Sequence, residues 1–407
     1  MNNNLRTAAL IGAGIVGAAS VTAEEAKLNP VETALSATTI SGYVSTSALF
    51  DVTGTKGGVV LPGRSFDQGN GAYNKIDQIN LDVVKLTIEK APSETEWSAG
   101  YKADLLFGPD ANLLATTSRF GYNTSDFAVK QAYVALRAPV GNGLTAKVGV
   151  FDTVIGYEVF EAGNNPNYSR SYAYAIEPTQ HTGVLLTYQA TEAFAINAGV
   201  ANAYNSRINA PGGEPGSTKD FGIQTYMGSL SLTAPESFGS LKGATLYAGI
   251  VHGLSSVPDA LDGDPRTSIY GGLTVPLPVT GLAAGVAYDY RFTERYRGLA
   301  VENAPEYATA MAGYLTYEVA KQVKLNVRGE YATGSAGTWG AKTVAGRSNE
   351  EFFALTGTID INLWDHALTR LEVRWDQDLT EGGGAFGNGG HPKDEAIIAG
   401  VNVIYKF

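Results

Sequence analysis

The chain has 407 residues, a formal net charge of −11, 49 glycines and no cysteine. The lack of cysteine excludes a disulfide framework and a thiolate site, and the acidic balance argues against nucleic acid, which requires a basic face. No segment after residue 23 has 18 uninterrupted apolar residues, so a membrane-spanning form of this chain would have to cross with β-strands.

The first 23 residues are predicted to be a cleaved signal peptide. Arg6 is their only charge, an apolar run extends from Ala8 to Ala19, and small residues precede Glu24. Residues 12–17 match the letters of a dinucleotide-binding fingerprint but lack the strand, helix and downstream acid that such a site needs. Residues 24–38 would then be a short periplasmic segment, followed by one barrel domain over 39–407.

Sixteen segments after residue 38 are predicted to be β-strands. They lie near 39–51, 79–90, 95–107, 127–138, 143–152, 180–189, 192–204, 219–233, 240–253, 266–277, 280–292, 306–319, 322–334, 350–361, 366–378 and 395–407. Short and long gaps alternate between them, which is typical of outer-membrane barrels with short periplasmic turns and long outer loops. We therefore expect an all-β, transmembrane, antiparallel barrel of about 16 strands, or of 18 if two strands were merged.

Several of these segments alternate between apolar and polar residues, so each strand would have one face of each kind. The apolar face is rich in Ala, Gly and Val, which suits lipid better than a sandwich core. The polar face would line a water-filled lumen. Its candidates are Lys102, Asp104, Arg137, Lys147, Asp289, Arg291, Lys324, Arg328, Glu330, Asp360, Arg370, Glu372, Arg374 and Asp376. These charges could set a transverse field, or they could pair with each other and stiffen the wall.

The last strand ends at the carboxyl terminus with Tyr405 and Phe407 on the same face. In bacterial outer-membrane proteins, an aromatic last residue on such a strand is presented to the barrel-assembly machinery. We interpret Tyr405 and Phe407 as that assembly signal.

The region 130–205 carries a family resemblance. It contains QAYV at 131–134, KVGVFDTVIGYE at 147–158, NPNYSRS at 165–171 and EPTQHTG at 177–183. This stretch resembles the β-barrel porin-2 family, the OmpL-like outer-membrane porins of Gram-negative bacteria, while the rest of the chain is similar in plan. The resemblance implies passive diffusion of small hydrophilic solutes and ions through the outer membrane.

The third outer loop of general porins folds into the lumen, so by resemblance residues 153–178 are the candidate constriction. Its candidate residues are Glu158, Glu161, Tyr168, Arg170, Tyr172 and Glu177. Alternatively, the loop is a solvated surface segment in which Arg170 pairs with a nearby glutamate. If the acids surround the water path, the pore is expected to be weakly cation-selective.

No catalytic motif was found, so we expect no enzyme, cofactor or metal site. Asp259, Asp262 and Asp264 lack the full calcium-loop pattern, and His181 is expected to be a hydrogen-bonding anchor. The expected partners are outer-membrane lipid, the barrel-assembly machinery and solutes, with a homotrimer as a candidate assembly. The alternatives are a sugar or oligosaccharide channel, for which Tyr168, Tyr172 and Tyr174 would supply aromatic faces, a surface adhesin or structural barrel with a plugged lumen, and a secreted β-sandwich or solenoid.

Overall fold

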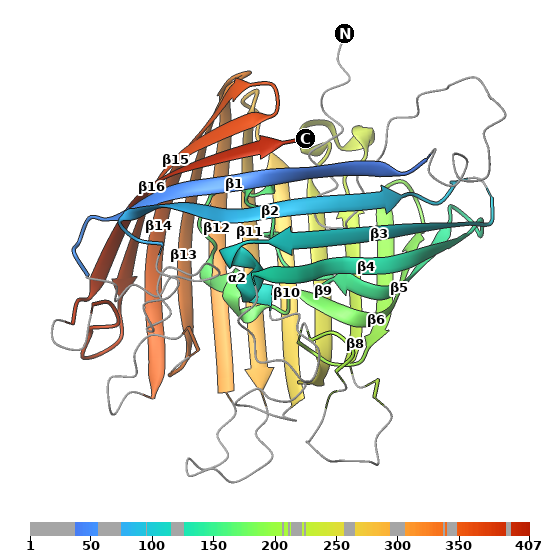
Figure 1. Ribbon diagram of the computed structural model, residues 1–407, viewed down its shortest axis with the longest axis horizontal. Coiled ribbons are helices and arrows are strands. Elements are labelled where there is room, and N and C mark those ends of the chain that lie inside the picture. Colours follow the sequence, from blue (N-terminus) through green and yellow to red (C-terminus); the bar gives the residue numbers. More distant parts are fainter. Residues whose placement is uncertain are drawn as a thin grey trace.

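The computed structural model describes most of the chain outside the N-terminal segment and several long loops. The described residues are 37–55, 75–94, 96–114, 126–205, 207–210, 212, 222–223, 225–255, 265–293, 306–336, 338–339, 348–387 and 392–407. They form one closed antiparallel barrel in which every strand pairs with its neighbours in the chain and β1 pairs with β16 (Figure 1). Among these residues, no helix is long and apolar enough to cross a membrane.

The barrel has 16 strands, as the alternating pattern predicted. They are β1 (Thr39–Asp51), β2 (Gln78–Lys90), β3 (Ser98–Phe107), β4 (Phe127–Ala138), β5 (Leu144–Asp152), β6 (Gln180–Gln189), β7 (Phe194–Ala201), β8 (Thr225–Thr233), β9 (Thr245–Leu254), β10 (Pro265–Pro276), β11 (Leu282–Thr293), β12 (Glu306–Ala320), β13 (Val323–Ser335), β14 (Asn349–Trp364), β15 (Ala367–Asp378) and β16 (Glu395–Lys406). The described helical segments are short: η1 (Pro109–Leu114), η2 (Ala162–Asn164), α2 (Tyr172–Ile176) and η3 (Glu236–Leu241).

Two strand ends differ from the sequence prediction for visible reasons. Strand β9 begins at Thr245 and not near 240, because η3 occupies the preceding turn. Strand β7 ends at Ala201 and not at 204, because Tyr204 leaves the ladder and its hydroxyl shares a hydrogen bond of 2.5 Å with Ser268. The sequence thus located the strands, whereas tertiary contacts decided where these two end.

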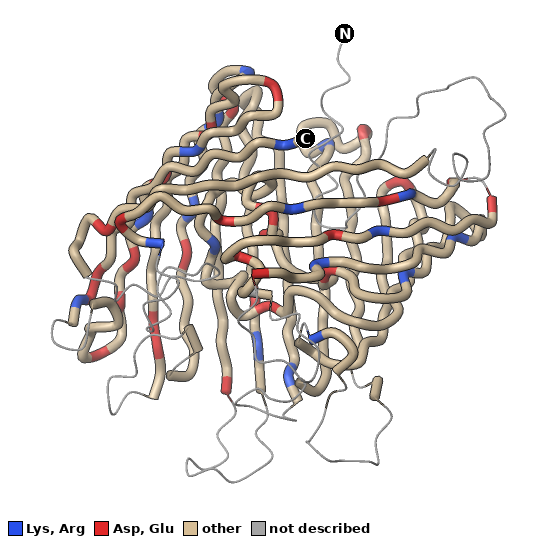
Figure 2. Tube along the Cα trace, in the orientation of Figure 1, with Lys and Arg blue, Asp and Glu red and all other residues tan. Residues whose placement is uncertain are grey.

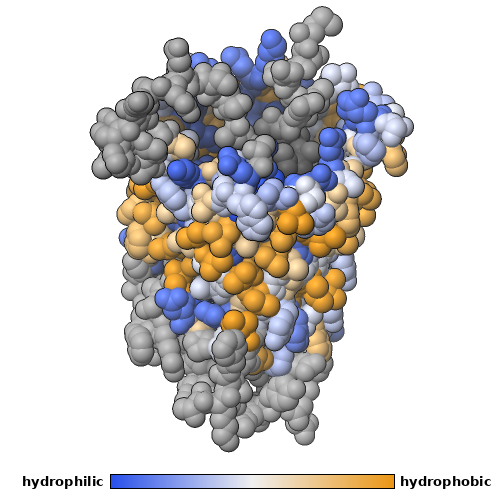
Figure 3. All heavy atoms as spheres, turned by 90° about the vertical axis from the view of Figure 1, so that its right-hand side faces the viewer, coloured by the Kyte–Doolittle hydropathy of each residue, from blue (hydrophilic) through white to orange (hydrophobic). Residues whose placement is uncertain are grey.

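The two faces of the strands divide as predicted. On β13, Val327 is 44% exposed while its neighbour Arg328 is fully buried. On β15, Val373 is 55% exposed while Arg374 is 1% exposed. Arginines on the inner face and valines on the outer face match a barrel with a polar interior and an apolar exterior. Figure 3 shows the apolar side chains of one outer face gathered in a band, with hydrophilic side chains above it.

Both ends of the barrel sheet meet on the rim that carries the short turns. The backbone N–H of Gly42 in β1 donates to the carbonyl of Phe407 at 2.9 Å, and the N–H of Phe407 donates back at 3.0 Å. A Cβ on Gly42 would lie 2.7 Å from the Phe407 ring, so glycine lets that ring approach β1. These contacts close the seam between the first and last strands.

Several sequence predictions lie outside the described residues. They are the signal peptide at 1–23, most of the segment 24–38 and the acidic loop with Asp259, Asp262 and Asp264. His181, by contrast, is buried in β6, where its ring nitrogens lie 3.2 Å from the Thr153 hydroxyl and 3.5 Å from the Ala203 carbonyl. The prediction that it is a hydrogen-bonding anchor is confirmed.

Candidate channel constriction

The loop between β5 and β6, residues 153–178, lies against the inner wall on the opposite side of the barrel. The backbone N–H groups of Tyr168 and Ser169 donate to the carboxylate of Glu372 in β15 at 2.6 and 2.9 Å. The Lys406 ammonium of β16 also lies 3.4 Å from Asn164 Oδ1 of the loop. Because Glu372 points into the barrel, the loop occupies its interior.

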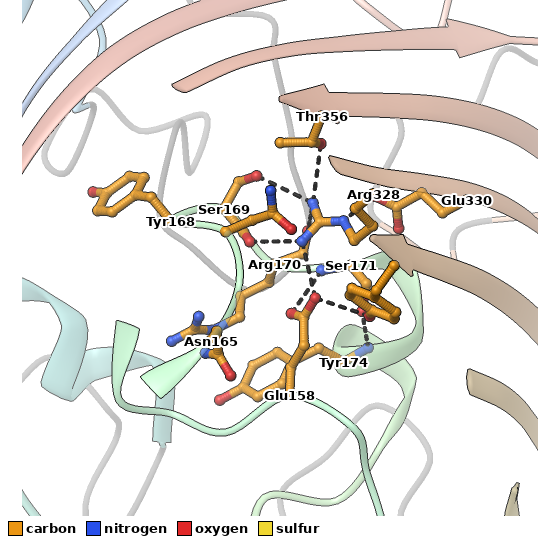
Figure 4. Close-up of polar contacts among 12 residues, drawn as sticks. Glu158, Asn165, Tyr168, Ser169, Arg170, Ser171, Tyr174, Arg328, Glu330 and Thr356 are labelled. Atoms are coloured by element: carbon orange, nitrogen blue, oxygen red, sulfur yellow. Dashed lines mark hydrogen bonds and ion pairs between the residues drawn. The ribbon is translucent and has the colours of Figure 1, made fainter. Parts of the chain in front are cut away.

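Arg328 of β13 is one of three wall arginines that anchor this loop, together with Arg370 and Arg374 (Figure 4). Its Nη1 lies 2.9 Å from Glu158 Oε1 and 2.8 Å from the Ser169 carbonyl, and its Nη2 donates to the Arg170 carbonyl at 3.2 Å. Its Nε also pairs with Glu330 at 2.9 Å. The guanidinium fork therefore binds both a loop carboxylate and the loop backbone.

Arg370 and Arg374 of β15 act in the same way. Arg370 donates to the carbonyls of Ala162 and Asn165 at 2.5 Å each, and Arg374 donates to the Arg170 carbonyl at 2.5 Å. Carboxylates on the same wall balance their charges: Asp360 lies 3.0 Å from Arg370 and Asp376 lies 2.6 Å from Arg374. The wall charges that sequence analysis singled out are thus largely paired with each other and bound to the loop.

A second anchor lies on strands β2 and β4. Glu161 of the loop accepts a hydrogen bond from Lys85 at 2.6 Å and lies 3.4 Å from Lys130. Burial raises the pKa of the Glu161 carboxyl, but the ammonium groups of Lys130 and Lys85 outweigh burial and lower that pKa below its usual range. Glu161 is therefore held as a carboxylate between two cations.

Glu177, near the end of the loop, has a carboxyl group as its neighbour. Burial, reinforced by the charge of Asp289 on β11, raises the pKa of the Glu177 carboxyl well above its ordinary value. The neutral form of Glu177 is therefore favoured, so the loop carries less negative charge than a count of its glutamates suggests.

Tyr168 and Tyr172 are packed against the wall and are only 2% and 1% exposed. The Tyr168 hydroxyl donates to Asp82 at 3.0 Å, and the Tyr172 hydroxyl donates to Asp376 at 2.9 Å. The Tyr172 ring also stacks on Phe352 at 5.2 Å. These two rings fasten the loop, so they present no open aromatic face to a passing sugar.

The remaining predicted residues lie in different surroundings. Lys102 pairs with Glu89 at 3.0 Å, Arg291 is half-buried on the inner face of β11, and Tyr405 and Phe407 lie exposed on the outer face. Arg170 is buried, and its guanidinium lies over the Tyr174 ring at 5.1 Å. The structure thus joins the loop residues to Arg328, Arg370 and Arg374, but not to Lys102.

Sequence analysis missed Asp82, a fully buried carboxylate in β2. It accepts hydrogen bonds from Ser45 at 2.9 Å, from Ser47 at 2.8 Å and from Lys75 at 2.7 Å, besides the one from Tyr168. It therefore ties β1, β2 and the loop together. The available signal was a lone acid at the beginning of an otherwise apolar run, which is costly to bury without partners. No group of three potential metal ligands occurs among the described residues.

Comparisons with known proteins agree with this architecture. A family model described as "Putative beta-barrel porin-2, OmpL-like" matches residues 37–407. A search of curated proteins finds no match. Similar solved structures include the trimer form of OmpT from Vibrio cholerae, with 14% identity, a TM-score of 0.54 and coverage of 91% of this chain and 99% of that one.

Two further structures are similar at the level of the fold. The anion-selective porin from Comamonas acidovorans shares 12% identity with a TM-score of 0.57, covering 91% of this chain and 99% of its own. The channel DcaP of Acinetobacter baumannii shares 10% identity with a TM-score of 0.57, covering 91% and 97%. With the family model matching the whole barrel and a 16-stranded closed sheet around a polar interior, the chain belongs to the OmpL-like β-barrel porin-2 family of outer-membrane channels.

Proposed function

We propose that the protein is a diffusion porin whose aperture is set by the loop 153–178. The observation that carries the proposal is the anchoring of this loop at two separate places on the wall, by Arg328 of β13 and Glu372 of β15 at one and by Lys85 of β2 at the other. An aperture can discriminate by size only if its edge stays in place, and these buried ion pairs and backbone hydrogen bonds hold that edge. Small hydrophilic solutes and ions would pass beside the loop.

We further propose that the protein is exported and inserted into the bacterial outer membrane. Residues 1–23 would direct export, the short turns would face the periplasm and the long loops would face outward. Outer-membrane lipid would surround the apolar band, and Tyr405 with Phe407 would engage the barrel-assembly machinery. The trimer form of the structurally similar OmpT supports a homotrimer as the assembly to test first.

The test is polymer exclusion measured on single channels of the refolded chain 24–407 in a planar bilayer. The wild type is expected to show discrete steps and to exclude all but short polyethylene glycols. Glu372→Ala and Arg370→Met each release part of the loop, so each should admit longer polymers and raise conductance. Glu351→Gln is the control, because the Glu351 carboxylate accepts a hydrogen bond from the exposed Tyr331 hydroxyl of β13 and not from the loop.

Two results would contradict the proposal. A folded, inserted barrel without conductance would indicate a plugged lumen. An unchanged exclusion size in both anchor variants would show that something other than the loop sets the aperture.

A further inference from the structure

Arg137 and Lys147 lie side by side on the inner wall, near the short-turn rim. In the pairing of β4 with β5, Lys147 faces Ala135, which is two residues from Arg137 on the same face. The intervening residues Val134 and Leu136 are 48% and 49% exposed on the apolar outer face. Strand alternation therefore directs both cations into the lumen.

Neither cation has a carboxylate partner within ion-pair distance among the described residues. The Arg137 guanidinium donates to the Thr145 hydroxyl and to the carbonyls of Asn142 and Glu94, each at 3.3 Å. The Lys147 ammonium lies over the Tyr133 ring, 4.9 Å from its centre. These contacts orient the two side chains, but no described carboxylate lies within ion-pair distance of either positive charge.

The acids closest to these strands are engaged elsewhere. Glu89 pairs with Lys102 at 3.0 Å, Asp104 with Lys85 at 3.1 Å, and Asp152 with Lys130 at 2.5 Å. Around the wall in the other direction, the strands β6 to β9 contain no Lys, Arg, Asp or Glu (Figure 2). The two cations thus stand at the edge of a wide neutral wall, and the wall acids Glu89, Asp104 and Asp152 already pair with other lysines.

We propose that Arg137 and Lys147 form an anion-binding subsite in the lumen, which gives the channel a preference for small carboxylate-bearing solutes. This inference rests on the proposed diffusion function. Uncompensated charges on a channel wall concentrate ions of opposite sign, and a guanidinium matches the two oxygens of a carboxylate. Beside them, a row of uncharged groups can bond the polar remainder of a solute: Thr187 donates to Asn197 at 2.7 Å, and Asn197 donates to Ser229 at 3.1 Å.

The proposed preference is opposite in sign to the cation selectivity expected from the loop acids. That expectation required free carboxylates at the constriction. Arg328 neutralises Glu158, Lys85 and Lys130 neutralise Glu161, and burial beside Asp289 raises the pKa of Glu177, which favours its neutral form. With the loop acids compensated, the unpaired wall cations determine the sign of the field.

The test compares reversal potentials across a bilayer with unequal potassium chloride on the two sides. The wild type is expected to favour chloride, and Arg137→Gln/Lys147→Gln should lower the chloride-to-potassium permeability ratio on the order of tenfold. Lys242→Gln is the matched control, because it removes one cation from the same rim at an exposed pair with Glu236. Lys147→Glu is a second variant, which should shift the permeability further from chloride toward potassium.

A ligand measurement addresses the subsite directly. Succinate added to the chamber should reduce the wild-type chloride current saturably and should leave the current of the double variant unaffected. A conducting wild type that favours potassium, or a double variant that behaves like Lys242→Gln, would overturn the subsite while the channel function stands. A folded barrel that conducts nothing would instead contradict the diffusion function, and the subsite with it.

Discussion

Arg328 of β13 and Glu158 of the loop 153–178 form a buried ion pair across the lumen, with 2.9 Å between Nη1 and Oε1. Their side chains are 0% and 1% exposed, so bulk water does not solvate either charge. The pair joins residues 170 positions apart in the chain. It therefore holds the loop against strand β13.

Removing one member of this pair should be costly. We expect Glu158→Gln to lower the free energy of unfolding by about 3–5 kcal/mol, because Arg328 would keep a buried charge with one fewer counter-charge. The measurement is urea unfolding in detergent micelles, followed by tryptophan fluorescence. Glu236→Gln, at the exposed pair with Lys242, should leave unfolding nearly unchanged. Equal effects of the two substitutions would show that the buried pair contributes no more to the free energy of unfolding than the exposed pair does.

The two loop acids Glu161 and Glu177 should respond to pH in opposite directions. The folded-state pKa of Glu161 is lowered, so its contribution to stability is present above an unfolded pKa of about 4.3 and is lost as the pH falls below it. The folded-state pKa of Glu177 is raised, so its contribution is present below about 4.3 and is lost as the pH rises toward the folded-state value.

Unfolding curves recorded from about pH 2 to about pH 9 test both signs. Glu177→Gln keeps a neutral hydrogen-bonding group beside Asp289 and should remove the loss of stability on the alkaline side. Glu161→Gln should remove the loss on the acid side, at a lower overall stability. A wild-type profile that neither substitution alters would mean that other groups dominate the pH dependence.

Gly149 is predicted to be indispensable for packing β5 against β4. Its φ is +137°, and a Cβ there would lie 2.3 Å from the Ala132 carbonyl oxygen. Gly149→Ala should therefore lower the yield of refolded barrel and the free energy of unfolding, as judged by the gel shift of unboiled samples. Gly329→Ala is the matched control, because nothing lies within 4 Å of its Cβ position. A normal yield from Gly149→Ala would contradict this reading of the β4–β5 contact.

The terminal aromatic residue is predicted to act in assembly more than in the stability of the finished barrel. Phe407→Ala keeps the two backbone hydrogen bonds to Gly42 while removing the exposed ring. Insertion in cells should fall strongly, whereas refolding from urea into detergent should stay close to the wild type. Val403→Ala, which trims another exposed side chain of β16, should affect neither process much. If cellular insertion is normal without the ring, Phe407 is not the signal.

The alternation on β13 and β15 explains why the fold could be predicted. A period of two places Val327 and Val373 on one face and Arg328 and Arg374 on the other, whatever the partner strands are. Turn lengths then indicated which ends of the strands lie on the same rim. Both signals are local, so neither required knowledge of distant contacts.

The candidate site could be predicted only in part. Sequence analysis named Glu158, Arg328, Glu372 and Tyr168 as members of a loop and a wall, and the structure brings them together. It missed Asp82, and the burial of Tyr168 and Tyr172 does not favour the aromatic faces that the alternative sugar channel would need. Whether a polar side chain faces water or a partner depends on contacts between segments far apart in the chain.

The sequence by itself determined the barrel, a strand number of about 16 and the alternation of inward and outward side chains along the strands, because strand geometry repeats every two residues. Only the tertiary structure decided which inward charges are neutralised. Arg328 meets Glu158 because the loop crosses the lumen, while Arg137 and Lys147 have no carboxylate partner in the part of the chain that the structure describes, where neighbouring acids bind other lysines. Electrostatic pairing depends on distances of a few ångströms between remote residues, and those distances exist only once the barrel has closed around its loop.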